Sequence, residues 1–236
     1  MDTVVIESKY CGPSTSANGG YTAGLLASRL TVPLATVEVT LLLPPPLGVE
    51  LAVDVDGDGQ SARLLAGSQV MASARVVPPM EITTPAPIPF VAAALDQSSP
   101  VVLDPDSHPF NSCFVCGTAR DPSDALRIFP AELVGRDVMV AAYQPAEQYC
   151  APEFVWAALD CPSSFPMYLA SQPFSGPAVL GRMTMTPTTS LTPDARYVIQ
   201  AWRERIEGRK LLAAAALYDE SGEVVAAARA TWIRLR

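Results

Sequence analysis

Two segments of the chain look like the same helix start used twice, and each has lost half of its chemistry. The first, residues 17–27, begins with the pair Gly19-Gly20 but has no acid near its end, whereas the second, residues 151–160, ends in Asp160. Free amides at a helix start carry roughly half a positive charge and stabilise a developing anion. A carboxylate acts as a general base or as a nucleophile. The two segments together therefore predict one site, with backbone donors from the first and an acid from the second.

An alignment of the two segments shows what each has lost. When Asn18 is aligned with Ala151, the first segment keeps Gly19 and Gly20 but ends in Ala27. The second segment has Pro152 at the position of Gly19 and ends in Asp160.

Each of these residues also has a purely structural explanation. Asn18 is a good helix N-cap, and Gly19 and Gly20 are suited to close packing of the helix. Asp160 precedes Cys161-Pro162 and is therefore also suited to cap a new helical turn that begins at the proline. The sequence leaves these structural roles open beside the catalytic role.

The elements that carry these residues are apolar on nearly all faces, which indicates buried helices. Tyr21 and Trp156 lie on them and are candidates for substrate contact, although the pattern does not separate a pocket wall from the core. An apolar helix followed by several strand-like segments predicts an α+β fold. Strands are expected over residues 3–10, 35–43, 50–55 and 69–77 in the first half, and over 126–134, 137–143, 179–186, 196–207, 210–219 and 223–234 in the second.

The two halves share more than their helices. The hexapeptides at residues 70–75 and 224–229 are identical at four of six positions, and each follows a turn that contains glycine. Between the halves, residues 78–112 carry eight prolines, which favour extended connecting structure. A short helical turn is predicted inside this linker at residues 91–95. These features indicate a duplicated unit.

A Cys-x-x-Cys pair, Cys113 and Cys116, lies close to the single histidine, His108. Three ligands at this spacing fall short of a typical structural zinc site, which has four. We therefore expect a packed or turn-forming cysteine pair and neither a metal nor a cofactor. No nucleophile elbow, phosphate-binding loop or zinc-protease helix is present.

Composition excludes several classes of function. The chain of 236 residues is 49% apolar, enough for a large core, but its longest apolar run is too short to span a membrane. The net charge of −8 argues against nonspecific binding to nucleic acids. The odd number of cysteines, five, and the lack of a basic leader at the N-terminus indicate a cytoplasmic protein.

The order of strand, buried helix and antiparallel sheet, given twice, resembles the double hotdog fold of the acyl-CoA thioesterase superfamily. Residues 12–21 resemble the start of the first hotdog helix in thioesterase-like proteins. Residues 111–117, with 125–128 after them, are similar to the segment that leads into many single-hotdog thioesterases. The resemblance implies a tandem double hotdog, with two antiparallel sheets that each wrap a central helix. Its expected parts are a first repeat at residues 1–78, a linker at 79–112 and a second repeat at 113–236.

The resemblance also implies an activity. These enzymes often begin the helix with His-Gly-Gly, so that Asn18 stands where the family has histidine, and their acid nine residues later corresponds to Asp160. In the family the glycine amide and the acid come from different helices, so Gly19 would pair with Asp160. The opposite pairing lacks both groups, because Pro152 has no amide proton and Ala27 has no acid. The resemblance therefore implies that one of two pseudo-symmetric sites is intact and the other dismantled. Gly19 would polarise the thioester carbonyl, with Asn18 and Gly20 beside it, and Asp160 would activate water or attack directly. Thr231, with Thr184 and Thr186 as alternatives, is a candidate polar partner of the acid.

The implied partner is a small-molecule acyl-CoA thioester, with further copies of the chain as possible oligomer partners. The alternative is a hotdog protein that binds acyl-CoA or lipid without turnover. A hydratase or dehydratase fits poorly, because those hotdog enzymes pair an acid with a histidine and His108 falls in the linker.

Overall fold

The computed structural model describes residues 2–96, 108–133, 135–169 and 176–235. Its strands form one antiparallel sheet of 11 strands in the order β1-β3-β4-β5-β2-β8-β11-β10-β9-β7-β6. The first half contributes β1 (Asp2–Val5), β2 (Thr36–Leu41), β3 (Glu50–Val55), β4 (Ser61–Ala66) and β5 (Gln69–Val77). The second contributes β6 (Ala131–Leu133), β7 (Val138–Tyr143), β8 (Ala178–Met185), β9 (Tyr197–Glu207), β10 (Lys210–Tyr218) and β11 (Val224–Arg234).

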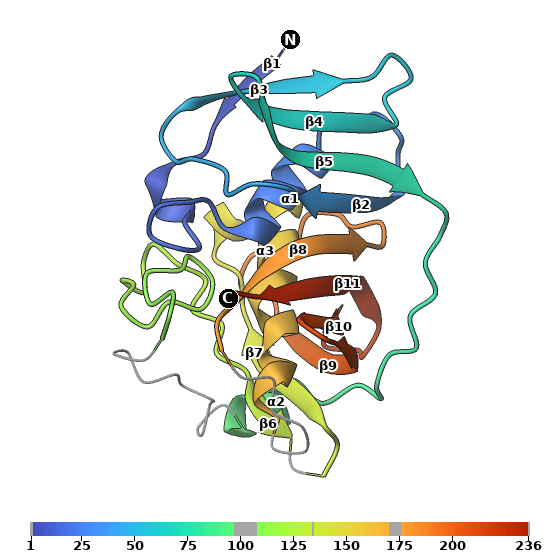
Figure 1. Cartoon of the computed structure of the whole chain (residues 1–236). Helices are drawn as coiled ribbons and strands as arrows, with labels where there is room; N and C mark the ends of the chain where they lie inside the picture. The colour runs from blue at the N-terminus through green and yellow to red at the C-terminus, as the bar shows by residue number, and fades with distance from the viewer. Residues whose placement is uncertain (1, 97–107, 134, 170–175, 236) are drawn as a thin grey trace.

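The strand order shows that the two halves have the same topology. The first half runs β1-β3-β4-β5-β2, and the second, followed from its far end, runs β7-β9-β10-β11-β8 after the short edge strand β6. Each half also has one long helix at the equivalent place, α1 (Gly19–Ala27) after β1 and α3 (Pro152–Ser164) after β7. The duplicated unit inferred from the sequence is therefore present in the fold (Figure 1).

The two sheets expected from the sequence are joined into one. Strands β2 and β8 pair antiparallel, with Val37 opposite Met185 and Val39 opposite Met183. These four apolar side chains are buried, whereas Glu38 lies between them on the outer face, where it pairs with Arg75 and Arg182. Because the buried faces of the two strands coincide, the halves share one continuous sheet (Figure 1).

The two long helices, α1 and α3, pack against each other and run in opposite directions. Gly20 lies against Trp156 and Asp160, and Gly24, one turn later, lies against Glu153, one turn earlier in α3. A methyl group on Gly20 would stand 2.6 Å from the Trp156 carbonyl oxygen, and one on Gly24 would stand 2.6 Å from the Glu153 Cα. The helices therefore approach closely because α1 presents two glycines on one face, and this contact sets the distance between the two halves of the site.

Several boundaries differ from those expected. Strand β4 was not predicted, because its residues 61–66 mix polar and apolar types in a short run after a turn. The expected strand at residues 3–10 ends at Val5 and gives way to a 3₁₀ turn, Ser8–Tyr10. The expected strand at 126–134 is reduced to β6.

The segment after β5 covers the outer face of the second half. The Tyr218 hydroxyl donates to the Pro85 carbonyl at 2.8 Å, and Gln200 donates to Ala86 at 3.3 Å. The helical turn expected in the linker is α2, Phe90–Asp96, which packs on Val140 and Val198 through Ala93. Linker residues 97–107 lie outside the described part of the chain. Within the described ranges no helix is long and apolar enough to cross a membrane.

Candidate active site

Asn18 caps helix α1 and also reaches across to α3. Its side-chain oxygen accepts from the Tyr21 amide at 2.9 Å, so the N-cap expected from the sequence is confirmed. Its side-chain nitrogen donates to the Asp160 carboxylate at 3.0 Å. Because Asn18 is only 2% exposed, this one residue fixes both the first turn of α1 and the rotamer of the acid.

Asp160 lies in the middle of α3 and not at the start of a new turn, because the helix continues through Pro162 to Ser164. Its Oδ2 accepts from the Gly20 amide at 2.8 Å as well as from Asn18. Its other oxygen, Oδ1, is buried and has no partner among the described residues. Burial raises the pKa of Asp160 to about 7, although the bonds from Gly20 and Asn18 oppose the shift. The structure thus holds a carboxyl group with one oxygen fixed and the other free.

The Gly19 amide is the remaining donor of this helix start. The amides on either side of it are used, since Asn18 donates to the Tyr10 carbonyl, Gly20 to Asp160 and Tyr21 to the Asn18 side chain. No acceptor for Gly19 exists among the residues that the structure describes, and Gly19 borders the same cavity as Asp160. Only glycine fits at this position, because a Cβ on Gly19 would stand 2.9 Å from the Leu41 Cδ1 and 3.1 Å from the Leu180 Cβ. Gly19 and Asp160 therefore border one space.

This space is a cavity of about 210 Å³. A void on the order of 150 Å³ holds a benzene ring, so the cavity has room for a thioester and the first part of an acyl chain. Its walls come from the loop before α1, the end of β2, the second half of α3 and β8, and are mainly apolar. They include Leu41, Leu42, Leu43, Phe165, Met167, Leu180 and Trp232.

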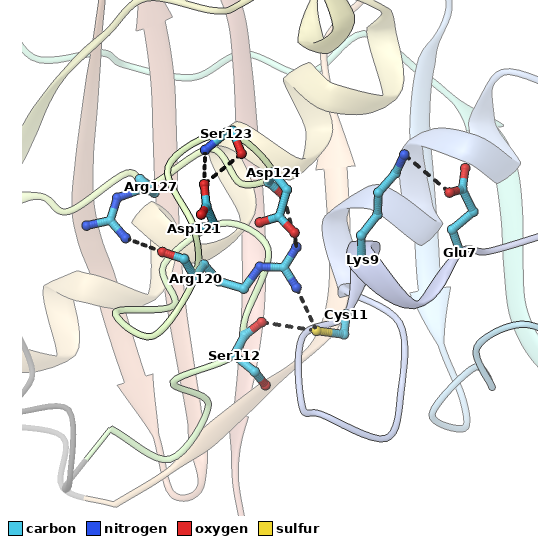
Figure 2. A network of polar contacts seen from close by, with 9 residues as sticks. All are labelled: Glu7, Lys9, Cys11, Ser112, Arg120, Asp121, Ser123, Asp124 and Arg127. Carbon is cyan, nitrogen blue, oxygen red and sulfur yellow. Dashed lines mark hydrogen bonds and ion pairs between the residues drawn. The ribbon is translucent and has the colours of Figure 1, made fainter.

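The loop around residues 113–116, in the second half of the chain, forms one side of the cavity and contributes two cysteines to it. Cys113 and Cys116 lie there beside Cys161 of α3, and all three are buried. The loop is tied to the first half by hydrogen bonds from the Phe114 amide to the Cys11 carbonyl, and from the Cys11 thiol to the Ser112 carbonyl. Figure 2 shows how Arg120 and Asp124 brace it next to Cys11. The sequence signalled the Cys-x-x-Cys pair but missed Cys161, whose nearness to the pair depends on the tertiary fold.

The cysteines perturb one another. Hydrogen bonds with Cys116 and Cys161 hold the pKa of the Cys113 thiol well below its ordinary value, despite the opposing effect of burial. The same bonds raise the pKa of Cys116 and of Cys161.

His108 borders the cavity too, contrary to the expectation that a linker histidine would lie apart from the acid. Its Nδ1 accepts from the Phe110 amide at 2.9 Å, so its Nε2 carries the proton and donates to the Cys116 carbonyl at 3.1 Å. Burial lowers the pKa of His108. Both ring nitrogens are thus occupied by backbone groups, which leaves none to act as a base on a substrate.

Four of the predicted site residues lie away from the cavity walls. Gly20 uses its amide on Asp160, Tyr21 stacks on Tyr10 at 4.2 Å between ring centroids, and Trp156 is core between the helices. Thr231 is opposite Arg182, which is exposed, whereas the next residue, Trp232, is opposite Leu180 and faces the helices. Neighbouring strand residues face opposite sides, so Thr231 points away from the acid.

The two alternative threonines are also engaged elsewhere. Thr184 hydrogen-bonds to Glu38 at 3.5 Å, and the Thr186 hydroxyl accepts from the Ala227 amide at 2.9 Å. The polar partner of Asp160 is Asn18, which the sequence had suggested mainly as a cap.

Two variants separate the roles of Asn18. Asn18→Ala removes the cap and should lower the free energy of unfolding by about 1 kcal/mol. Asn18→Ser keeps a capping oxygen but is too short to reach Asp160, so it should be more stable than Asn18→Ala. Both variants remove a hydrogen bond that lowers the pKa of Asp160, so both should raise this pKa. Urea unfolding curves and an NMR titration of Asp160 test this; equal stability of the two variants would contradict the capping role.

No protein-family model and no curated protein matches the sequence. Among solved structures, the chain is similar to a provisionally assigned thioesterase II from Thermobifida fusca YX, with 16% identity and a TM-score of 0.63 over 99% of this chain and 92% of that one. It is similar to the acyl-CoA thioesterase II TesB2 from Mycobacterium marinum, with 14% identity and a TM-score of 0.56 over 98% and 91%. It is also similar to a pyran synthase domain from module nine of the sorangicin pathway, with 12% identity and a TM-score of 0.60 over 99% and 93%. A further neighbour is a conserved protein of unknown function from Alicyclobacillus acidocaldarius with a hot dog fold, at 10% identity and a TM-score of 0.61 over 99% and 92%. The chain therefore has the hotdog fold shared by these thioesterases, and the reaction has to be argued from its own residues.

Proposed function

We propose that the protein is an acyl-CoA thioesterase with a single active site shared by its two repeats. The observation that carries the proposal is that Gly19, whose amide has no acceptor among the described residues, and Asp160, whose Oδ1 has no partner among them either, border the same cavity. Thioester hydrolysis builds negative charge on the carbonyl oxygen, and a well-aimed amide in that place stabilises the transition state by about 3 kcal/mol. Two structural neighbours named as thioesterases support the substrate class.

In the proposed reaction the thioester carbonyl oxygen accepts a hydrogen bond from the Gly19 amide. Asp160 takes the proton of a water molecule through its free Oδ1, and the hydroxide attacks the carbonyl carbon. The tetrahedral intermediate collapses with loss of the CoA thiolate, which takes up the proton. Asn18 and Gly20 hold Oδ2, so that Oδ1 remains aimed at the water.

The second pseudo-symmetric position, where α3 begins and α1 ends, lacks both the amide and the acid, and this supports the assignment. Helix α3 begins at Pro152, which has no amide proton, and Ala151 before it provides no side-chain cap. Ala27, the position equivalent to Asp160, ends α1 without a carboxylate. We infer that one site per chain turns over.

A dehydratase is the competing reaction, because a pyran synthase domain and a dehydratase share the fold. Such a reaction would need a free base beside the acid. His108 is the single histidine of the chain, and its two ring nitrogens are bound to backbone groups. The geometry of His108 therefore favours hydrolysis.

A panel of acyl-CoA substrates of increasing chain length tests the proposal. Release of free thiol, followed with a thiol reagent, is the expected result, and hydration of an enoyl-CoA, followed by its absorbance, should not occur. Binding of acyl-CoA without thiol release would contradict hydrolysis and indicate a protein that only binds the thioester.

The cationic part of the CoA site is proposed at the end of β11. The cavity wall includes Pro177, whose carbonyl accepts from the Leu235 amide at 2.9 Å. Arg209 lies beside this rim, because its guanidinium donates to the Arg234 carbonyl at 3.3 Å. The described cavity walls themselves carry no lysine or arginine, so the CoA phosphates need cations at the rim.

Arg209→Ala should raise the KM for acyl-CoA about two- to fivefold at low salt, as expected for one exposed charge pair. The KM for the same acyl group on N-acetylcysteamine, which lacks phosphates, should not change. Arg63→Ala is the matched control, because Arg63 pairs with Asp54 on the outer face of the first half. An equal effect of Arg209→Ala on both substrates would contradict phosphate binding at this rim.

A further inference from the structure

Three of the five cysteines converge on one point beside the cavity. Their Sγ atoms all lie within 4.8 Å of one another, and those of Cys113 and Cys161 are 3.6 Å apart. The exposed fractions of Cys113, Cys116 and Cys161 are 2%, 7% and 7%. The proposed hydrolysis uses none of these sulfurs.

The spacing of the sulfurs matches that of thiolates around a metal ion. Zinc binds thiolate sulfur at about 2.3 Å with tetrahedral angles, which places two sulfur ligands about 3.8 Å apart. The Cys113–Cys161 separation of 3.6 Å is close to this value, and the other two separations are no more than 4.8 Å.

The backbone around the first cysteine is arranged for a thiolate. The Val115 amide points at the Cys113 sulfur at 3.4 Å. Gly117 closes the turn by donating to the Cys113 carbonyl at 2.8 Å, and a methyl group there would stand 2.6 Å from the Asn111 carbonyl oxygen. Amides directed at sulfur stabilise its charged form, which is the form that binds metals.

The third sulfur is supplied by a rigid element. Cys161 follows Asp160 in α3, and the Asn18 side-chain nitrogen lies 3.8 Å from the Cys113 sulfur and 3.9 Å from the Cys161 sulfur. All three cysteines border the cavity, so a fourth coordination position faces it. His108 does not provide the fourth ligand, because both of its ring nitrogens bind backbone groups.

We propose that Cys113, Cys116 and Cys161 form a binding site for a thiophilic d¹⁰ cation, with Zn²⁺ as the occupant and its fourth position open to the cavity. Three protein ligands with one open position are typical of zinc that contacts water or a substrate. Binding releases the thiol protons to solvent, so the affinity should rise with pH. The expectation of a merely packed Cys113–Cys116 pair changes because the fold adds the third sulfur. The site does not depend on the proposed hydrolysis.

Metal content is the primary test. The full-length protein, stripped with a chelator under reducing conditions, is titrated with Zn²⁺ in competition with a chromophoric chelator. We expect a single Zn²⁺ per chain, and substitution by Co²⁺ should give thiolate-to-cobalt charge-transfer absorption. Cys161→Ser and Cys113→Ser should both lose stoichiometric binding. Cys150→Ser is the matched control and should retain it, because Cys150 is a buried free cysteine outside the cluster.

Three results would overturn the proposal. The first is wild-type protein that binds no stoichiometric Zn²⁺, or that binds Cu⁺ instead. The second is Cys161→Ser protein that binds Zn²⁺ as the wild type does. The third is an intact mass lower by two hydrogens in freshly purified protein, because it would show a disulfide in place of the free thiols. If the serine variants fail to fold, the wild-type stoichiometry and the Co²⁺ spectrum decide. An active, zinc-free enzyme would overturn only this site, and a zinc protein without hydrolysis would overturn only the proposed function.

Discussion

Replacement of Asp160 by asparagine is expected to lower kcat for thioester hydrolysis by about a thousandfold, within the range that removal of a general base costs. Asparagine has the same shape as aspartate and can still accept hydrogen bonds from Gly20 and Asn18 through its side-chain oxygen. It presents no basic oxygen to a water molecule. The fold and the affinity for the substrate should therefore persist while turnover is lost.

Steady-state thiol release by wild type and Asp160→Asn, together with the Kd of a non-hydrolysable ketone analogue of the substrate, measures this effect. Glu153→Gln is the matched control, since it also replaces a carboxylate of α3 by an amide. Glu153 lies in the first turn of this helix, at the end that lacks an amide donor. It should hydrolyse the substrate at close to the wild-type rate. Undiminished turnover by Asp160→Asn would mean that another group activates the water.

Gly20→Ala is expected to destabilise the protein by about 3 kcal/mol, the upper part of the usual range for overpacking. The added methyl group would stand 2.6 Å from the Trp156 carbonyl oxygen and would press on the Asp160 side chain. Neither neighbour can move away, because both belong to the buried helix α3. In a chain of this size the loss corresponds to a Tm lower by about 10 °C.

Thermal unfolding of three glycine variants tests this packing argument. Gly24→Ala should behave like Gly20→Ala, because its methyl group would lie 2.6 Å from the Glu153 Cα. Gly57→Ala should change the Tm little, since nothing lies within 4 Å of the position that its methyl group would take. Similar Tm values for all three variants would contradict the close approach of the two helices.

The sequence predicted those parts of the fold that local patterns encode. Apolar helices at residues 19–27 and 152–164, the long strands of the second half and the repetition of the unit follow from periodicity and from short identities. The pairing of Asp160 with the amide of Gly19 was inferred because each half lacks what the other keeps, and the catalytic role of both residues remains a prediction. The domain boundaries at residues 78 and 112, and an oligomer of further copies, remain predictions.

The remaining features of the fold and the site could not be predicted from the sequence, because they depend on the tertiary arrangement. The union of two sheets into one depends on the pairing of β2 with β8, which are far apart in the chain and show no pairing signal of their own. Whether Tyr21 and Trp156 line a pocket or the core depends on which helix faces meet. Cys161 joins Cys113 and Cys116 only because α3 lies beside the loop that carries them. Thr231 was proposed without knowledge of which face of β11 points toward the helices, and the structure places it on the opposite face from Trp232.

The most direct test of the shared site is the crystal structure of Asp160→Asn with an intact acyl-CoA bound. In this complex the thioester oxygen should lie about 2.7–3.1 Å from the Gly19 nitrogen. A water molecule should lie between the carbonyl carbon and residue 160. A thioester bound elsewhere, or a Gly19 amide that is occupied by a protein acceptor in the complex, would contradict the assignment of one active site to the two helices.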